Sequence, residues 1–268
     1  MRSNPNRFAV QKTLLRDVIV NDAQLLDFGF PAHCHEHVVI GALSFGEKTS
    51  KYGFRRHEVR QGDVMLVNPG QTHDGVPAGR QGRRHTMLEI DIAAFERMCA
   101  FACGRADVEF ERPIVRSPEI YRAFRMWRRA LLADDAAMEQ EAQIHFFGVL
   151  QEAGAFGPRG VKRVPELANR ARLRILESLD APDHFTDMAC QFGVSRYQVL
   201  RAFRAAYGMT PEEFRRQQRV QRARDALGNG ESLSEVAASA GFSDQSHMTR
   251  EFRRLVGVTP GEYRYALQ

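Results

Sequence analysis

The sequence predicts an α+β protein, in which a β-rich N-terminal domain with a helical hairpin precedes an all-α domain. Three observations lead to this fold class. Short apolar segments bounded by turn residues occupy positions 14–92, and helical apolar spacing replaces them afterwards. Two related segments about 48–49 residues apart then fill the C-terminal part of the chain.

Five segments of the N-terminal part have the composition of β-strands: 14–20, 25–30, 38–45, 63–67 and 86–92. Turn signals such as Gln61-Gly62-Asp63 and Asn68-Pro69-Gly70 separate them. Short strands at regular spacing, joined by Gly-rich turns, are typical of a β-sandwich or a β-barrel.

Two helices are expected after the strands. Ile120, Phe124, Trp127 and Leu131 recur at helical spacing, and a second helix is expected over 136–153. This apolar stripe predicts packing against the β-domain, although such stripes also pair helices between subunits. Gly157-Pro158 interrupts the helical pattern. We therefore predict a first domain over 1–156, a linker over 157–163 and a second domain over 164–268.

Composition sets broad limits on the class of protein. The chain has 268 residues, 43% hydrophobic and 26% charged, which suits two folded domains of ordinary size. A net charge of +5 is compatible with a polyanionic partner without requiring one. The four cysteines form no paired framework, and the N-terminus has no apolar signal core. These features predict a cytoplasmic protein without a membrane span.

The internal repeat is the most informative feature. The first copy covers 185–215 and the second covers 233–264, with one extra residue entering the second copy after its glycine. Each copy has a short helix, a glycine suited to the left-handed conformation (Gly193 or Gly241) and a serine that can cap the next helix (Ser195 or Ser243). This order of parts predicts two helix-turn-helix units.

The second helix of each unit carries polar side chains opposite its apolar side. Arginine can bind guanine, glutamine can bind adenine, and Ser or His can donate to or accept from a base edge. Two such faces at matched positions predict DNA recognition. The candidate residues are Arg196, Tyr197, Gln198 and Arg201 in the first unit, and Gln245, Ser246, His247 and Arg250 in the second.

A spacer helix is predicted between the units. Thr210 can cap it, Pro211 suits its first position, and Glu213 completes a capping box. A helix to about Leu227 is about 25 Å long and can direct two helices toward major grooves about 34 Å apart. Its arginines could contact phosphates, but solvation is expected for most of them. They are Arg215, Arg216, Arg219, Arg222 and Arg224.

This region resembles the AraC/XylS family of bacterial transcription regulators over about Val164 to Tyr265. The similarity includes both copies, the spacer and the segment 240–252, where Met248 replaces the more usual Phe. The resemblance implies that six of the candidate residues reach base edges while backbone amides bind phosphate. The six are Tyr197, Gln198, Arg201, Ser246, His247 and Arg250.

The stretch from Phe30 to Asp74 resembles the cupin-like sensor domain of the same family. The resemblance rests on Pro31–His37, Gly41, Gly62-Asp63 and Asn68–His73. It implies that the N-terminal domain is a cupin-like β-barrel that takes a small-molecule effector in its interior, with His33, His35 and His73 as candidate pocket residues.

The same three histidines also match the pattern by which enzymatic cupins hold a metal. Such cupins carry a carboxylate four or five residues after the second histidine, where this chain has Val39 or Ile40. We therefore expect no metal, no other cofactor and no catalytic residue. The alternatives are a metal-dependent cupin enzyme with a DNA-binding tail, and a metal sensor.

Together these features predict an effector-responsive transcription regulator, with activation the commoner behaviour of the family. The expected partners are double-stranded DNA, RNA polymerase, the small-molecule effector and a second copy bound through the N-terminal domain. Because the two recognition faces differ, one subunit should read a non-palindromic half-site. The sequence does not identify the effector. Five arginines would suit an acidic ligand but are expected to face solvent: Arg55, Arg56, Arg60, Arg83 and Arg84.

Overall fold

The structure is a computed structural model that describes residues 6–12, 17–53, 55–133, 135–160, 164–180 and 185–267. It contains two compact units. One comprises Met1–Gly29 and Cys34–Val161 and is rich in β-strands. The other comprises Lys162–Ala266 and is helical, and the short segment Phe30–His33 is grouped with it although its strand belongs to a β-sheet. The predicted order of a β-rich part followed by an all-α part is therefore confirmed.

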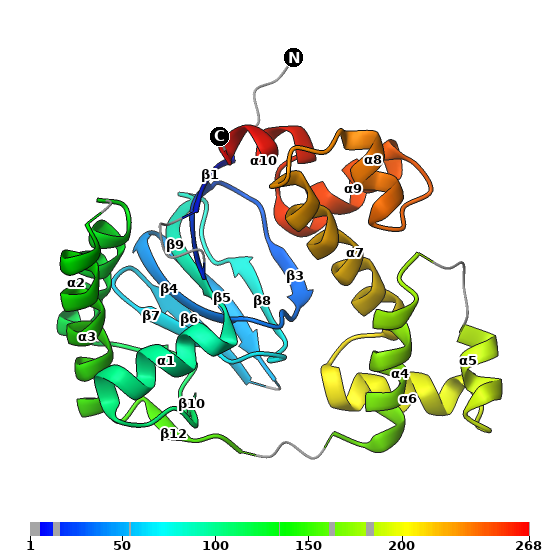
Figure 1. Ribbon diagram of the computed structural model, residues 1–268, viewed down its shortest axis with the longest axis horizontal. Helices are drawn as coiled ribbons and strands as arrows, with labels where there is room; N and C mark the ends of the chain where they lie inside the picture. The colour runs from blue at the N-terminus through cyan, green and yellow to red at the C-terminus, as the bar shows by residue number, and fades with distance from the viewer. Residues whose placement is uncertain are drawn as a thin grey trace. The chain divides into compact units, whose positions relative to one another are not determined.

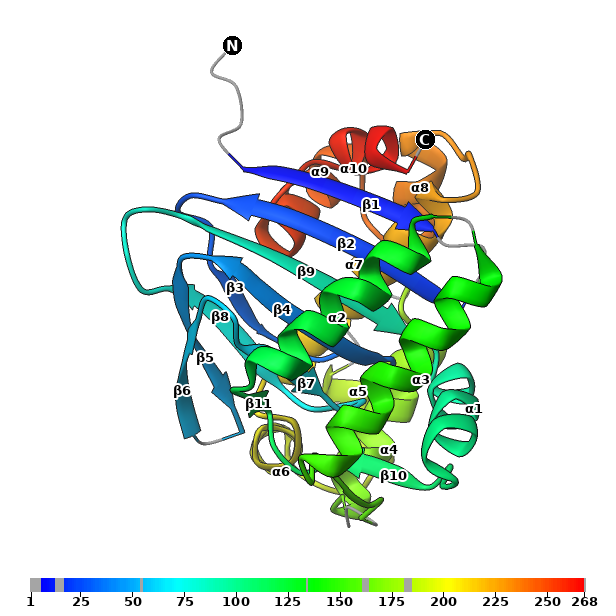
Figure 2. The same cartoon turned by 90° about the vertical axis from the view of Figure 1, so that its left-hand side faces the viewer.

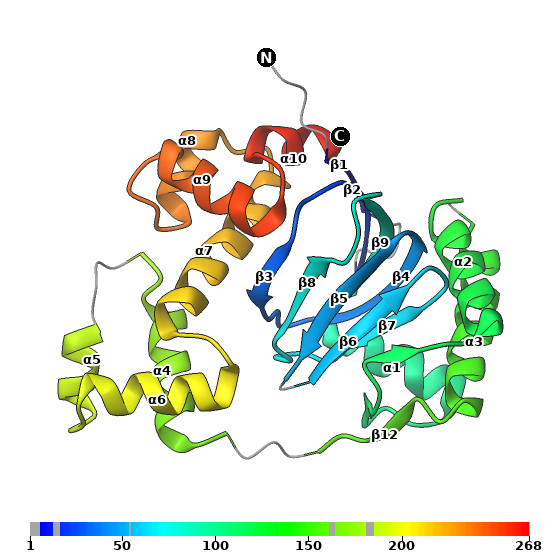
Figure 3. The ribbon, with the colours of Figure 1, turned by 180° about the vertical axis from the view of Figure 1, so that it is seen from behind.

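The strands of the first unit belong to separate sheets rather than to one closed ring, among the residues described. A six-stranded sheet has the order β1 (Arg7–Lys12), β2 (Val18–Leu25), β9 (Arg83–Ile90), β4 (Val38–Phe45), β7 (Val64–Val67) and β11 (Ile114–Val115). A four-stranded sheet has the order β3 (Phe30–His33), β8 (His73–Pro77), β5 (Glu47–Tyr52) and β6 (Arg55–Arg60). Figure 3 shows β8, β5 and β6 side by side.

Some of the predicted strands match the observed ones and others do not. Strand 38–45 is confirmed as β4, and 63–67 is nearly β7. The segment 14–20 overlaps β2 only at 18–20, and its residues 14–16 lie outside the described residues. The segment 25–30 contains the end of β2 and the start of β3, so the strand predicted there is wrong. The sequence reading missed β5, β6 and β8, because polar or small residues such as Lys48, Ser50 and Gly75 occupy most of their buried positions and leave no apolar alternation.

The two faces of the six-stranded sheet have different partners. Successive residues of a strand point to opposite faces, so Leu88 and Ile90 of β9 face one way and Met87 the other. Leu88 and Ile90 belong to a core that includes residues of α1 (Ile92–Cys103), α2 (Pro118–Leu131) and α3 (Ala136–Glu152). Figure 2 shows α2 and α3 lying across this sheet. Met87 instead packs against Val39 and Tyr52, between the two sheets.

The apolar stripe of α2 is part of this core. Ile120, Phe124, Trp127 and Leu131 are each at most 4% exposed within a single chain. The prediction of packing against the β-domain is therefore confirmed. The alternative of a subunit seam made by these four side chains is wrong, because they have no surface left to offer a partner.

The first residues of the predicted linker are part of a strand. Phe156–Pro158 form β12, which pairs with β10 (Val108–Phe110), so Gly157-Pro158 belongs to the β-rich unit. The glycine lacks a side chain at a point where a Cβ would meet the Glu111 carboxylate. Residues 161–163 of the predicted linker lie outside the described residues.

The helical unit has the predicted duplicated architecture. After α4 (Glu166–Glu177) come two helix pairs, α5 (Phe185–Gln191) with α6 (Arg196–Tyr207), and α8 (Leu233–Ser239) with α9 (Gln245–Val256). The spacer α7 (Pro211–Leu227) joins them, and α10 (Pro260–Ala266) ends the unit (Figure 1). Thr210 and Glu213 form the predicted capping box, and α7 ends at Leu227 as expected.

The two turn glycines have the predicted left-handed backbone, with φ of 66° at Gly193 and 81° at Gly241. Their surroundings differ. A Cβ on Gly193 would meet nothing within 4 Å, whereas a Cβ on Gly241 would lie 2.8 Å from the Leu179 carbonyl oxygen and from Cα of Asp180. Glycine is thus required at position 193 only because φ is positive there. At position 241 it is required both for the positive φ and because there is no room for a Cβ.

This difference predicts unequal costs for two identical substitutions. Gly193→Ala should destabilise the helical unit by about 1–2 kcal/mol through left-handed strain alone. Gly241→Ala should cost at least about 1 kcal/mol more, because backbone atoms must also move away from the new methyl group. Urea unfolding followed by far-UV circular dichroism measures both.

The single tryptophan, Trp127, lies in the core of the β-rich unit, so its fluorescence reports that unit separately. The fluorescence transition should be the same in both variants. Equal losses for the two alanine substitutions would contradict the close approach at Gly241.

Candidate DNA-binding surface and effector site

The first recognition helix, α6, begins at a complete capping box. The Ser195 hydroxyl accepts a hydrogen bond from the Gln198 backbone N–H, and the Ser195 backbone N–H donates to Oε1 of Gln198 at 2.8 Å. Arg196, Tyr197 and Arg201 are exposed, with Tyr197 at 68%. The structure thus presents three of the four predicted side chains freely, while Gln198 also holds the helix start.

The second recognition helix, α9, begins differently from the prediction. Asp244, and not Ser243, is the N-cap, because its carboxylate accepts from the His247 N–H at 2.7 Å. That N–H, followed by the Ser243 hydroxyl, lowers the pKa of the Asp244 carboxyl. The predicted serine cap is therefore wrong in the second unit, where the extra residue moves the helix start by one position.

The cap positions align the two recognition helices. Ser195 corresponds to Asp244, so the first turn of α6 (Arg196, Tyr197, Gln198) matches the first turn of α9 (Gln245, Ser246, His247), and Arg201 matches Arg250. All are exposed except His247, which is half-buried. The His247 ring packs edge-on against Phe242, and its Nδ1 lies 3.1 Å from the Ser243 hydroxyl.

The opposite side of each recognition helix is buried as predicted. Val199 and Phe203 in α6, and Met248 and Phe252 in α9, are each 0% exposed. Met248, where the family more often has Phe, is accommodated completely. Each helix is therefore fixed in rotation, and this fixes which side chains reach the surface.

The arginines of the spacer α7 are mostly engaged within the protein. Arg219 donates to the Leu179 carbonyl at 2.6 Å, and Arg222 donates to the Ser239 carbonyl at 3.3 Å. Arg224 donates to the Tyr263 hydroxyl and lies over its ring. The expectation of solvated charge is wrong for Arg219 and Arg224, which are partly buried, whereas Arg222 is exposed as expected.

The remaining two spacer arginines form ion pairs. Arg215 contacts Glu212 at 2.6 Å, and Nε of Arg216 lies 4.0 Å from the Glu251 carboxylate of α9. The alternative role predicted for Arg215 and Arg216 is contact with DNA phosphates. That role would require both ion pairs to break.

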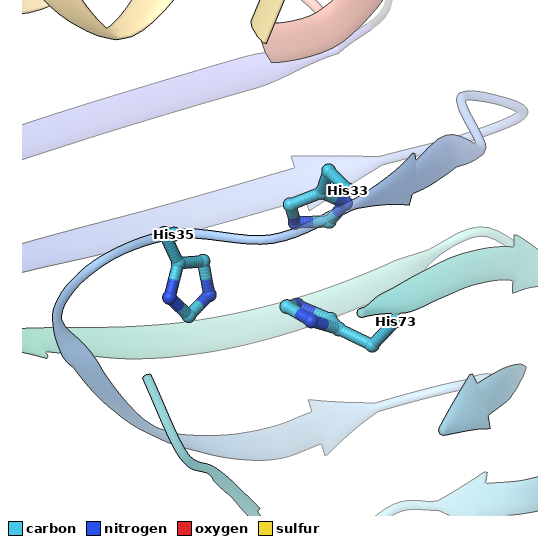
Figure 4. Close-up of side chains that lie close together, drawn as sticks. All are labelled: His33, His35 and His73. Carbon is cyan, nitrogen blue, oxygen red and sulfur yellow. The ribbon is translucent and has the colours of Figure 1, made fainter. Parts of the chain in front are cut away.

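His33, His35 and His73 come together where β3 lies beside β8 in the four-stranded sheet (Figure 4). One ring nitrogen from each lies within 4.8 Å of the others. In each ring Nδ1 bonds a backbone carbonyl: that of Pro31 at 2.8 Å, of His37 at 3.0 Å and of Gln71 at 3.0 Å. A carbonyl can only accept, so each Nδ1 carries a proton. The lone pair of each neutral ring is therefore on Nε2.

A cavity of about 950 Å³ lies on the other side of the six-stranded sheet, between β1, β2, β9 and α2. None of the three histidines lines it. The acidic residue that lines the cavity, Asp22, pairs with Arg128 and accepts a hydrogen bond from the Thr86 hydroxyl. The other lining arginines are Arg7, Arg84, Arg122, Arg125 and Arg129.

Sequence reasoning missed two buried cations. Lys48 is 4% exposed and Arg83 is 1% exposed, although Arg83 was expected to face solvent. The signal that could have found Lys48 is its alternation with Ser50 and Tyr52 along β5, which places all three on one face. The sequence around Arg83 has no comparable pattern, because the burial of this side chain depends on the pairing of β9 with β2 and β4.

Among the described residues, no helix combines the length and the apolar character needed to cross a membrane.

Comparison with known proteins gives a consistent result for both units. The AraC-like ligand binding domain matches residues 17–150, and a helix-turn-helix domain matches residues 188–266. The HTH-type transcriptional regulator YfiF of Bacillus subtilis (strain 168) is 31% identical over 253 residues, covering 87% of this chain and 78% of that protein. A second regulator of that strain, YbfI, is 24% identical and covers 82% of this chain and 81% of its own length.

The fold is also similar to that of a solved structure, the unsaturated fatty acid-bound ToxT from Vibrio cholerae. The two share a TM-score of 0.63 at 13% identity, over 94% of this chain and 96% of ToxT. The ligand-binding match, the relative matched over most of its length and the paired helix-turn-helix units agree. This chain belongs to the AraC/XylS family of transcription regulators.

Proposed function

We propose that this protein regulates transcription by binding a specific DNA sequence with α6 and α9, under the control of a small molecule bound by the β-rich unit. One observation carries the proposal: two recognition helices, each fixed by a buried apolar side, present exposed polar side chains at corresponding positions. Relatives along most of the chain are transcriptional regulators by name, and the proposal includes no catalytic step.

The exposed residues suit different roles at the DNA. Arg196, Arg201 and Arg250 can each bind a guanine edge in two places, and Gln245 can do so with adenine. Tyr197, Ser246 and the edge of His247 can add single contacts. Gln198 has its Oε1 in the capping box, so its amide NH₂ is the group that can donate to a base acceptor.

We propose further that two copies act together through the β-rich unit, and that the bound protein contacts RNA polymerase as an activator in the cytoplasm. Activation is the commoner behaviour implied by the family resemblance. The unequal recognition faces support a directional half-site for each copy.

The match to an AraC-like ligand binding domain supports the effector part of the proposal. ToxT, which shares the fold, has been solved with an unsaturated fatty acid bound. This precedent supports a small organic molecule as the effector class here.

Substitution of the matched arginines tests DNA reading. Selection from a random duplex library first defines the preferred site. Arg201→Ala and Arg250→Ala should then each weaken binding to that site by about 1–3 kcal/mol, or roughly 5- to 150-fold, and relax preference at one position. Titrations by fluorescence anisotropy at one fixed salt concentration measure the change.

Arg105→Ala, in an exposed loop of the β-rich unit, removes the same charge away from α6 and α9 and should bind as the wild type. Equal weakening on selected and random duplexes would make the two arginines phosphate contacts. Failure of the selection to enrich any sequence would refute the proposed function.

The histidine cluster supports a second candidate function, a response to a divalent metal. The donor set fits such an ion: three neutral imidazoles whose Nδ1–H groups are held by carbonyls, the arrangement that orients ligating histidines. His33, His35 and His73 would hold the metal, which would supply a charged, Lewis-acidic centre beside β3 and β8.

Titration of the metal-free protein with Zn²⁺ in a calorimeter tests this candidate. One equivalent should bind, and His73→Ala should weaken binding by tenfold or more because a ligand is lost. His145→Ala, on the exposed side of α3, is the matched control and should change nothing. Zn²⁺ binding that is unchanged in His73→Ala would exclude the cluster as the metal site.

A further inference from the structure

Three nitrogen-bearing side chains are buried together on the inward faces of β5 and β9. Lys48, Arg83 and His85 are 4%, 1% and 5% exposed. Arg83 and His85 share the face of β9 that carries Met87, which packs between the sheets. Their charges interact, since Lys48 and Arg83 both lower the pKa of His85, after the larger effect of burial.

The Arg83 guanidinium is only partly satisfied by the protein. Its Nη2 donates to the Phe28 carbonyl at 2.6 Å and is 3.5 Å from the Gly75 carbonyl. Its Nε and Nη1 are buried without a hydrogen-bond partner. Burial lowers the pKa of Arg83 to about 10, so the group stays charged near neutral pH. Buried donors of a charged group strongly favour an acceptor, preferably a negative one.

The acids near this cluster are committed elsewhere. Asp74 raises the pKa of Lys48, but its carboxylate accepts from the Lys51 N–H at 2.7 Å and pairs with Arg56 at 3.1 Å. Glu89 pairs with His37 and lies six residues along β9 from Arg83, roughly 20 Å away. Neither carboxylate contacts the Arg83 guanidinium.

The charge of the cluster matches a single negative charge. Burial first, and then repulsion from Arg83, lower the pKa of Lys48 to about 7. At neutral pH the cluster therefore carries the full charge of Arg83, a partial charge on Lys48 and a neutral His85. The surrounding interior is apolar, with Leu43, Val59 and Met65 packed beside Met87. A doubly charged phosphate would be more costly to desolvate there than a carboxylate.

Turns converge at the end of the sandwich where Arg83 lies. A Cβ on Gly46 would lie 2.2 Å from the Gly82 carbonyl and 3.1 Å from Cα of Arg83, and a Cβ on Gly82 would lie 2.9 Å from Leu26. Beside these glycines, Leu26 and Phe45 are 43% and 41% exposed. The end of a β-barrel or sandwich is a common location for small-ligand sites.

We propose that Lys48, Arg83 and His85 form the effector site, which takes the carboxylate of a small, largely apolar organic acid. This inference rests on the proposed function, because it names the chemical class of the effector. The carboxylate accepts hydrogen bonds from Nε and Nη1 of Arg83 and from the Lys48 ammonium.

Thermal unfolding with matched ligands tests the site. The probes are sodium acetate, benzoate and hexanoate at constant ionic strength, beside acetamide, benzamide and hexanamide, which keep the shape and lack the charge. At least benzoate or hexanoate should raise Tm saturably, by roughly 2–6 °C, and the amides should not. No saturable response to any of the three carboxylates overturns the proposal. Stabilisation by inorganic phosphate alone also overturns it.

Lys48→Met should weaken carboxylate binding without lowering the stability of the ligand-free protein. Replacing a buried amine by an apolar side chain of similar size should leave the ligand-free Tm equal to or above that of the wild type. Carboxylate affinity should fall by about tenfold or more, because a charged hydrogen bond is lost. Lys51→Met is the matched control, on the same strand but exposed, and should respond as the wild type. Lys48→Gln replaces Lys48→Met if the latter yields little folded protein.

An unchanged carboxylate response in Lys48→Met would move binding elsewhere, for example to the arginine-lined cavity beside α2, and would overturn the assignment. Binding to the selected duplex is measured in the same samples. The carboxylate should change duplex affinity in the wild type and in Lys51→Met, but not in Lys48→Met. A ligand that binds at Lys48 without changing duplex affinity contradicts the effector role alone. Loss of specific DNA binding in every sample contradicts the proposed function.

Discussion

The position of the spacer helix α7 determines how the helical unit presents its reading surfaces. The helix starts at the Thr210–Glu213 capping box and is held to its neighbours by arginine hydrogen bonds on both sides. Arg219 reaches the Leu179 carbonyl ahead of α5, while Arg222 and Arg224 reach groups of the second half. These bonds are directional, and a guanidinium donates several of them at fixed angles. They therefore restrain how the two halves can turn relative to each other.

The two recognition helices begin with different N-caps. Ser195 and Gln198 cap α6 reciprocally, whereas Asp244 caps α9 with an ionised carboxylate. The extra residue that separates the copies is absorbed before this cap, so the helices beyond it keep matched positions. The left-handed glycine before each cap serves both arrangements. At Gly241 it also makes room for the backbone at Leu179 and Asp180.

The β-rich unit is organised by the two faces of β9. One face supplies Leu88 and Ile90 to a core shared with α1, α2 and α3. The other supplies Arg83, His85 and Met87 to the space between the sheets, where polar groups cost free energy unless they gain partners. A domain that needed only stability would fill that space with apolar side chains. The buried cations are therefore better explained by a ligand than by packing.

The amino-acid sequence alone determined the architecture of the helical unit and the residues at its surface. The repeat, the turn glycines and the capping residues are patterns of residues close together in the chain, so they can be recognised from the sequence alone. It also determined that His33, His35 and His73 belong together, through the resemblance to a known sensor domain. The tertiary structure decided what depends on partners distant in sequence. It showed that the α2 stripe is core and that the α7 arginines are engaged. It also showed that Asp244 replaces Ser243 as a cap, and that Lys48 and Arg83 are buried. The burial of Arg83 is set by the pairing of its strand with others, and no local pattern in the sequence records that pairing.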